Sequence, residues 1–274
     1  MSTYPNLSVD YYEHYAVIGI EKKPANALTI QNCIDISKII KELEEDDSIR
    51  VIIIASKIRF AFFTGSDLDE ISEIMHRDGD PNKNMVDASR PVQEAFTSIE
   101  NSKKVLIAAI NGLTIGLGVE LALVCDIRIC SELAWFKTAQ TSIGIIPGAG
   151  GTQRLPKTVG IGKAKEIIYT AKKVNAQEAL QIGLVNQVVP SGKEFDAAVK
   201  MAESIINNTP VHAVRLAKQA INYGIYASTL QDGLDYEMDC LGETYDNPDS
   251  FEGIAAVMEK RKADFQNIEV NSKR

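Results

Sequence analysis

The stretch "NGLTIGLGVELALVCD", Asn111 to Asp126, decides the fold. Two closely spaced glycines, Gly116 and Gly118, lead into an apolar run that contains a single carboxylate, Glu120. The glycines predict a turn, and the apolar run after it predicts a buried helix. The position of Glu120, about one turn into that helix, therefore needs an explanation.

Two interpretations of Glu120 are open from the residues alone. A carboxylate among apolar neighbours is disfavoured as a charge, so its pKa should rise toward a value useful for proton transfer. Alternatively, Glu120 is a structural residue that pairs with a nearby arginine, for example Arg128. The first interpretation predicts a catalytic acid or base, and the second predicts only a buried ion pair.

Composition limits the class of protein. The chain has 274 residues, a formal charge of −8 and 45% hydrophobic residues, which predicts one large domain or a domain with an appended unit. No long basic run is present, so we expect no nucleic-acid partner. No apolar run is long enough to cross a bilayer, and the N-terminal residues do not resemble a secretory signal. We therefore expect no membrane insertion and a cytoplasmic location.

The cysteines and histidines do not predict a metal site. The four cysteines form no CxxC pair, and the three histidines lie far from them in the sequence. Cys125 and Cys130 lie among apolar residues and are interpreted as buried thiols, which fits a reducing compartment.

Periodicity predicts an α/β fold. Strands are expected at 15–21, 50–56, 104–110, 127–138 and 184–189, and a helix at 29–47 with Thr29 as its N-cap. The polar segment 75–89 is expected to be a surface loop. After Pro190 the pattern changes to amphipathic helices, so residues 1–190 are predicted to form the core and residues 191–274 a helical region. These helices have little core of their own, and we expect them to pack on neighbouring subunits of a homo-oligomer.

Two turns that follow predicted strands suggest a common site. Gly65 leads into Ser66, and Gly116 leads into Leu117, each at a predicted helix start where N–H groups lack helical partners. Two such N–H groups aimed at one point would form an oxyanion hole, and a nearby carboxylate would support proton transfer next to a carbonyl. An ordinary capped turn at Ser66 is the plainer alternative. The glycine spacing fits neither a phosphate loop nor a dinucleotide-binding fingerprint, and no nucleophile elbow occurs.

Six segments together resemble a known family. They are "PANAL" (24–28), "FTGSDLDE" (63–70), "INGLTIGLGVELALVCDIRI" (110–129), "GIIPGAGGTQRLPKTVG" (144–160), "AQEALQIGLVNQVVP" (176–190) and "EGIAAVMEKRKADF" (252–265). In this order they resemble the crotonase superfamily over nearly the whole chain, and enoyl-CoA hydratases most closely. The resemblance implies a spiral of ββα units followed by a helical C-terminal region that forms a trimer or a dimer of trimers.

The resemblance also implies a substrate, an acyl-CoA thioester. Coenzyme A is then part of the substrate, and no separate cofactor is expected. The thioester oxygen would lie between the N–H groups of Ser66 and Leu117. The path of coenzyme A would be lined by two alanines of the first motif and by the first helix start. These residues are Ala25, Ala27, Ser66, Asp67, Leu68 and Asp69, of which Asp69 stands where the family often has lysine.

One expected catalytic residue is replaced. Hydratases of this family use two glutamates, and the first corresponds to Glu120. The second corresponds to Gln140, which can hold a water molecule but cannot take or give its proton. The leading hypothesis is hydration of a 2-enoyl-CoA to a 3-hydroxyacyl-CoA, or the reverse. The alternatives are an enoyl-CoA isomerase that uses Glu120 alone, or an acyl-CoA-binding protein with little turnover.

Overall fold

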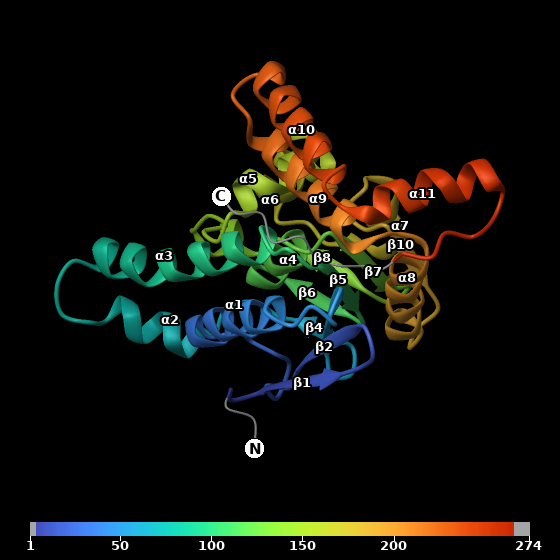
Figure 1. Cartoon of the computed structure of the whole chain (residues 1–274). Helices are drawn as coiled ribbons and strands as arrows, with labels where there is room; N and C mark the ends of the chain where they lie inside the picture. Colours follow the sequence, from blue (N-terminus) through green and yellow to red (C-terminus); the bar gives the residue numbers. More distant parts are fainter. Residues whose placement is uncertain (1–3, 266–274) are drawn as a thin grey trace.

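Two β-sheets with helices around them form the protein (Figure 1), of which the computed structural model describes residues 4–265. The strands are β1 (Leu7–Tyr11), β2 (Tyr15–Ile20), β3 (Val51–Ser56), β4 (Ala61–Phe63), β5 (Val105–Ile110), β6 (Leu113–Ile115), β7 (Ile127–Ser131), β8 (Trp135–Lys137), β9 (Val174–Asn175) and β10 (Gln187–Val189). The helices are α1 (Ile30–Glu44), α2 (Leu68–Met75), α3 (Pro81–Glu100), α4 (Leu117–Leu123), the 3₁₀ helix η1 (Gln140–Ile143), α5 (Gly151–Val159), α6 (Ile161–Thr170), α7 (Ala176–Gln181), α8 (Glu194–Asn208), α9 (Val211–Tyr226), α10 (Leu230–Thr244) and α11 (Pro248–Glu259).

Successive strand pairs divide between the two sheets. The larger sheet has the order β1-β2-β3-β5-β7-β10, and the smaller sheet has the order β4-β6-β8-β9. The pairs β3–β4, β5–β6 and β7–β8 therefore each place one strand in each sheet before the chain enters a helix. Neighbouring strands from different pairs run parallel. This arrangement is the expected spiral of ββα units, and the predicted fold class is confirmed.

The strands of the larger sheet are apolar on both faces because both faces are covered. Along β3, Ile52 and Ile54 enter the main core, whereas Val51 and Ile53 enter a second cluster on the opposite face. Side chains of a strand alternate between its two faces, so this division follows directly from the continuous apolar run. Helix α8 covers the second face and contributes Ala198 and Ala202 to it.

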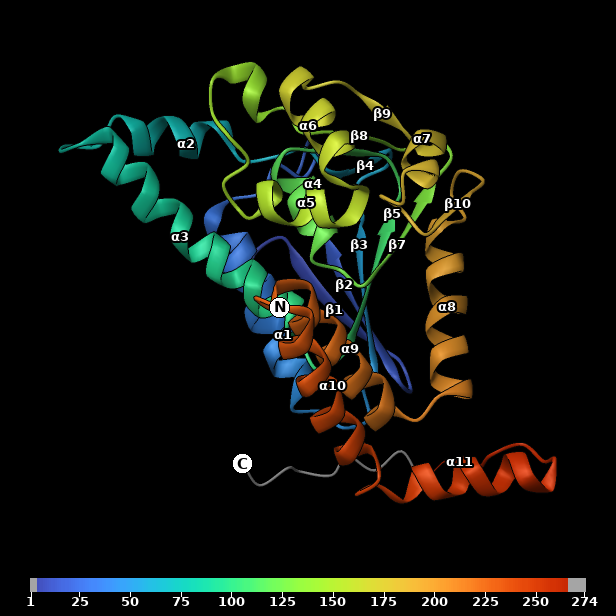
Figure 2. The ribbon, with the colours of Figure 1, turned by 90° about the horizontal axis from the view of Figure 1, so that it is seen from above.

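The helical C-terminal region is present, but its first helix differs from expectation. Helix α8 packs on the larger sheet of its own chain (Figure 2). Helix α10 pairs with α9, and α11 projects away from the core (Figure 1). The last part of the predicted region, residues 266–274, lies outside the described residues. The division of the chain at residue 190 stays a prediction.

Two local predictions were wrong. The segment 75–89 is not a loop, because α3 begins at Pro81, and Asp80 caps it by accepting a hydrogen bond from the N–H of Asn82. The many polar residues hid this helix start, although a proline in the first turn is typical of one. Residues 127–138 are not one strand but two, β7 and β8, which belong to different sheets. Helices α2 and α3 form a hairpin that extends from the core (Figure 2).

Candidate active site

Glu120 lies at the centre of the candidate site, on α4. Its side chain is buried, with 2% of the residue exposed. One carboxylate oxygen, Oε1, accepts hydrogen bonds of 2.8 Å from the N–H groups of both Ala149 and Gly151. The other oxygen, Oε2, accepts a 3.0 Å hydrogen bond from Nε2 of Gln140. Glu120 is therefore held by three donors and keeps one oxygen with further capacity to accept.

The arginine alternative for Glu120 is wrong. The Arg128 guanidinium is buried, but it donates to the main-chain oxygens of Ala122, Cys125 and Leu184. Ala122 lies in the last turn of α4 and Cys125 just after it, so Arg128 binds carbonyl groups at the end of that helix and not the carboxylate.

Burial changes the acidity of Glu120. Loss of solvation raises its pKa from an ordinary value of 4.5 to about 7, despite the opposing effect of the hydrogen bonds from Gly151, Ala149 and Gln140 and of the nearby Arg154 charge. The predicted direction is confirmed. A carboxyl group with this pKa is present in both ionisation states near neutral pH, as a group that both accepts and donates a proton must be.

Gln140 occupies the position next to Glu120, at the start of η1. Its amide nitrogen is used by Glu120, whereas its Oε1 is buried and accepts no hydrogen bond from residues 4–265. A buried carbonyl oxygen without a donor is unfavourable unless a ligand supplies one. Gln140 therefore offers an acceptor to a hydroxyl or water beside the carboxylate.

Ser66 and Leu117 lie around the same cavity as Glu120 and Gln140. This cavity has a volume of about 100 Å³ and is otherwise lined mainly by apolar side chains. We call it the Glu120 cavity. The structure thus brings together all four residues that the sequence placed at the reaction centre.

The main-chain N–H groups of Ser66 and Leu117 have no hydrogen-bond acceptor within the part of the chain that the structure describes. At Ser66 the reason is a parallel bridge, in which Leu28 donates to Gly65 O and accepts from the N–H of Asp67, both at 2.8 Å. The N–H of Ser66 itself must then point away from Leu28. Leu117 is the first residue of α4, so its N–H has no partner within the helix.

Two glycines permit this arrangement of α4. Gly116 has a φ of +53°, a region that favours glycine, and its conformation turns the chain from β6 into α4. Gly118 has a different role, since a Cβ there would lie 2.4 Å from the main-chain oxygen of Phe63. Helix α4 therefore approaches β4 closely enough to share one cavity with Ser66.

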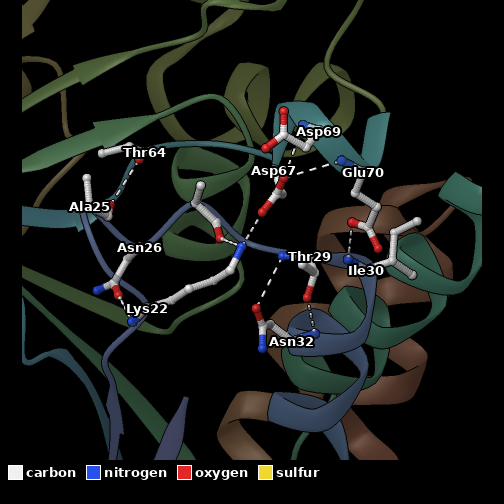
Figure 3. A network of polar contacts seen from close by, with 11 residues as sticks. Lys22, Ala25, Asn26, Thr29, Ile30, Asn32, Thr64, Asp67, Asp69 and Glu70 are labelled. Atoms are coloured by element: carbon white, nitrogen blue, oxygen red, sulfur yellow. Dashed lines mark hydrogen bonds and ion pairs between the residues drawn. The ribbon is translucent and has the colours of Figure 1, made fainter. Parts of the chain in front are cut away.

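Ion pairing and capping fix the loop that carries Ser66 (Figure 3). The Lys22 ammonium donates to Asp67 and, at 2.9 Å, to the main-chain oxygen of Ala27. Asp67 also caps α2 through the N–H groups of Asp69 and Glu70, and Lys22 holds the pKa of the Asp67 carboxyl below its usual range. These contacts join the loop that carries Ser66 to the segment 22–28, which lies beside it.

Helices α1 and α2 are capped from both sides of this loop. Thr29 and Asn32 form a capping box at the start of α1, which confirms the predicted N-cap. Glu70 of α2 reaches across and accepts a 2.9 Å hydrogen bond from the N–H of Ile30 (Figure 3). Two helix starts and the Ser66 loop are thereby built as one unit.

The remaining predicted binding residues lie outside the Glu120 cavity. Ala25 accepts a hydrogen bond from Thr64 Oγ1, and Ala27 accepts from Lys22, so both act through main-chain oxygens within the loop. Leu68 is 68% exposed at the start of α2. Asp69, also exposed, has its N–H bound to Asp67. A role of these residues in binding coenzyme A stays a prediction.

Sequence reasoning missed one wall of the cavity and two donors. Helix α3 contributes Met85, Ala88, Ser89 and Val92 to the lining. Their spacing of three, four and seven residues is that of one helix face and could have revealed them. The donors to Glu120 are main-chain N–H groups of a glycine-rich loop, and no side-chain pattern identifies such groups.

Across residues 4–265, no group of three or more His, Cys, Asp and Glu side chains is arranged to hold a metal ion. Within the same range, none of the helices combines the length and the apolar character that crossing a membrane requires.

Comparison with known proteins defines the class. Residues 11–268 match the model of the enoyl-CoA hydratase/isomerase family, and the chain belongs to this family. It is 37% identical to the short-chain-enoyl-CoA hydratase of Clostridium acetobutylicum over 92% of this chain and 94% of that protein. It is 35% identical to the crotonyl-CoA hydratase of Syntrophomonas wolfei, over 96% of this chain and 98% of that protein.

A solved structure shares the whole fold. The crystal structure of an enoyl-CoA hydratase from Bacillus anthracis superimposes with a TM-score of 0.87 at 37% identity, and the match covers 96% of this chain and 100% of that chain. The resemblance identified from the six sequence segments is therefore confirmed.

Proposed function

We propose that the protein is an enoyl-CoA hydratase that adds water to a 2-enoyl-CoA thioester or removes it from a 3-hydroxyacyl-CoA. The observation that carries the proposal is the meeting of Glu120, Gln140 and the free N–H groups of Ser66 and Leu117 at one cavity. The names of the relatives, which include a short-chain-enoyl-CoA and a crotonyl-CoA hydratase, favour hydration over isomerisation.

The thioester oxygen would accept hydrogen bonds from the N–H groups of Ser66 and Leu117. Addition at C3 of an enoyl thioester moves negative charge onto this oxygen, and two donors that are already in place stabilise that charge without rearrangement. Since only main-chain groups take part, Ser66 and Leu117 affect the reaction through backbone position more than through their side chains.

Glu120 would transfer the proton, and Gln140 would orient the water. In the hydration direction, the Glu120 carboxylate takes one proton from water as the oxygen bonds to C3. The resulting carboxylic acid then returns a proton to C2, so that one water molecule adds across the double bond and the enzyme is unchanged. Oε1 of Gln140 accepts the other O–H of the same water.

Because Gln140 stands at the position of the second glutamate, we expect a lower rate of hydration than two carboxylates would give. A glutamine orients water but adds no second acid or base, and general acid–base catalysis contributes roughly 100- to 10,000-fold. We therefore expect Gln140→Glu to raise kcat for hydration. Gln140→Ala should lower kcat less than Glu120→Gln does, because it leaves the proton-transferring group in place.

The test is loss of the conjugated thioester absorbance of crotonyl-CoA. The proposal predicts loss that is abolished by Glu120→Gln. No loss with crotonyl-CoA together with conversion of a 3-enoyl-CoA would instead establish the isomerase. Tight binding of acyl-CoA without either reaction would establish a binding protein.

We also propose that the protein forms a trimer or a dimer of trimers through its last helices. Large apolar side chains are exposed along α10, at its C-cap and along α11, at Leu230, Leu234, Met238, Leu241, Tyr245, Phe251, Ile254, Val257 and Met258. Apolar surface of this extent on projecting helices is typical of a subunit interface (Figure 1).

Light scattering after size exclusion tests the assembly. The expected mass is three or six times that of the chain, and a mass of one chain would contradict the proposal. Val257→Glu, a change at a side chain that is 78% exposed, should lower the mass without unfolding the chain.

A further inference from the structure

The loop from Pro147 to Gly151 carries both main-chain donors to Glu120. The N–H groups of Ala149 and Gly151 lie 2.8 Å from Oε1 of the carboxylate. These donors belong to peptide groups, so the orientation of two peptide planes decides how strongly the carboxylate is stabilised. Side chains from α3 and α5, outside the reaction centre, bind the main chain of this loop.

Gln93 of α3 holds the first plane. The C=O of Gly148 and the N–H of Ala149 belong to the same planar peptide group and point in opposite directions. Gly148 O accepts a 2.7 Å hydrogen bond from Gln93 Nε2, while the N–H on the other side donates to Glu120. A hydrogen bond to the carbonyl both fixes the plane and polarises the N–H, which makes it a better donor.

Arg154 of α5 holds the plane between these two, the peptide group formed by the C=O of Ala149 and the N–H of Gly150. Its Nη1 donates a 3.0 Å hydrogen bond to the main-chain oxygen of Ala149, between the two donors to Glu120. Its Nε and Nη2 are bound at 3.0 and 2.8 Å by Oε2 of Glu100, at the end of α3. Both Arg154 and Glu100 are largely buried, with 9% and 17% of their side chains exposed. Helix α3 thus supports the loop at two points.

We propose that Gln93 and Arg154 are positioning residues that keep the N–H groups of Ala149 and Gly151 directed at the Glu120 carboxylate. Gln93 does not line the Glu120 cavity, and neither does Arg154. Both act through the main chain of the loop. The inference rests on the proposed function only in that Glu120 is the acid and base; the contacts stand without it.

Besides the loop donors, few charged groups of the described chain influence the ionisation of Glu120. Among residues 4–265, the charged and titratable groups that face Glu120 are Arg154 of α5, Glu70 of α2, which lines the same cavity, and the buried Cys33 thiol of α1. Gln93 is uncharged and exposed. Its removal therefore changes the hydrogen bonding of the loop without changing any charge near Glu120.

The experiment is an infrared titration of the protonated carboxyl C=O band of Glu120. The band is isolated by subtracting the spectrum of the same protein with Glu120→Gln. Gln93→Ala should move the midpoint upward by roughly half a pH unit, because a weakened donor stabilises the carboxylate less. The matched control is Gln31→Ala, which removes a 2.6 Å hydrogen bond between two side chains on α1 and should leave the midpoint unchanged.

Arg154 is replaced by lysine, because a neutral residue would leave Glu100 without its ion-pair partner and would remove a charge that itself lowers the pKa of Glu120. Arg154→Lys keeps the charge but lacks the planar guanidinium that joins Ala149 O to Glu100, and it should also move the midpoint upward. An unchanged midpoint in either variant removes that residue from the proposal, and unchanged midpoints in both overturn it. The titration needs no turnover, so a protein inactive on crotonyl-CoA would contradict the proposed function and still permit this test.

Discussion

Replacement of Glu120 by glutamine should stabilise the protein at alkaline pH. The folded protein raises the pKa of this carboxyl group from 4.5 to about 7, so it binds the proton more tightly than the unfolded chain does. The stability that Glu120 contributes is therefore complete below pH 4.5 and is lost as the pH rises through 7. A glutamine is neutral throughout and escapes this loss.

The size of the effect follows from the two pKa values. A difference of about 2.5 between them corresponds to about 3 kcal/mol of unfolding free energy at high pH. Between about pH 5 and about pH 8.5 the expected change is about 2.5 kcal/mol, because part of the loss has already occurred at pH 5. The glutamine fits the site: its oxygen can accept from Ala149 and Gly151, and the Gln140 amide can turn to present Oε1 to the new NH₂ group.

The assay is urea unfolding of the wild type and Glu120→Gln at both pH values and at one protein concentration. The difference in unfolding free energy between the two proteins should grow in favour of the variant as the pH rises. Glu94→Gln, at an exposed position on α3, is the control and should show no such trend. A constant difference across this range would refute the conclusion that burial raises the pKa of Glu120.

Three further variants test the surrounding structure. Gly118→Ala places a Cβ 2.4 Å from Phe63 O and should lower the free energy of unfolding in urea by about 3 kcal/mol, whereas Gly162→Ala, where nothing lies within 4 Å, should not destabilise the fold. Thr29→Ala removes the capping box of α1 and should lower the thermal midpoint through a loss of about 1 kcal/mol; an unchanged midpoint would contradict its role. Lys22→Met should lower stability by about 1 kcal/mol at neutral pH, and the difference should vanish in acid unfolding curves as Asp67 becomes protonated, since Lys22 lowers the pKa of Asp67.

The centre of the site could be predicted because its signals are local. The glycine pair before Glu120 and the apolar residues after it predicted a turn, a helix and a carboxyl group of raised pKa. Each of these features depends on residues within one or two turns of chain. The position of Gln140 came from family resemblance, since no periodicity marks it.

The supports of the site could not be predicted because they depend on tertiary contacts. The loop from Pro147 to Gly151 binds Glu120 through main-chain N–H groups, which every residue except proline has, whatever its side chain. Helix α3 was partly hidden by polar residues at its start, although its inner face lines the cavity. The pairing of Lys22 with Asp67 joins residues 45 positions apart, beyond the range of any local pattern.

Helix α4 has a consequence for how the gene can vary. Leu117 and Glu120 lie on one rigid helix of seven residues, three positions apart. A codon inserted between them would rotate Glu120 by about 100° and shift it by about 1.5 Å, while Leu117 stayed in place. Variation in length must therefore fall outside this interval if the N–H of Leu117 and the carboxylate of Glu120 are to keep facing one cavity.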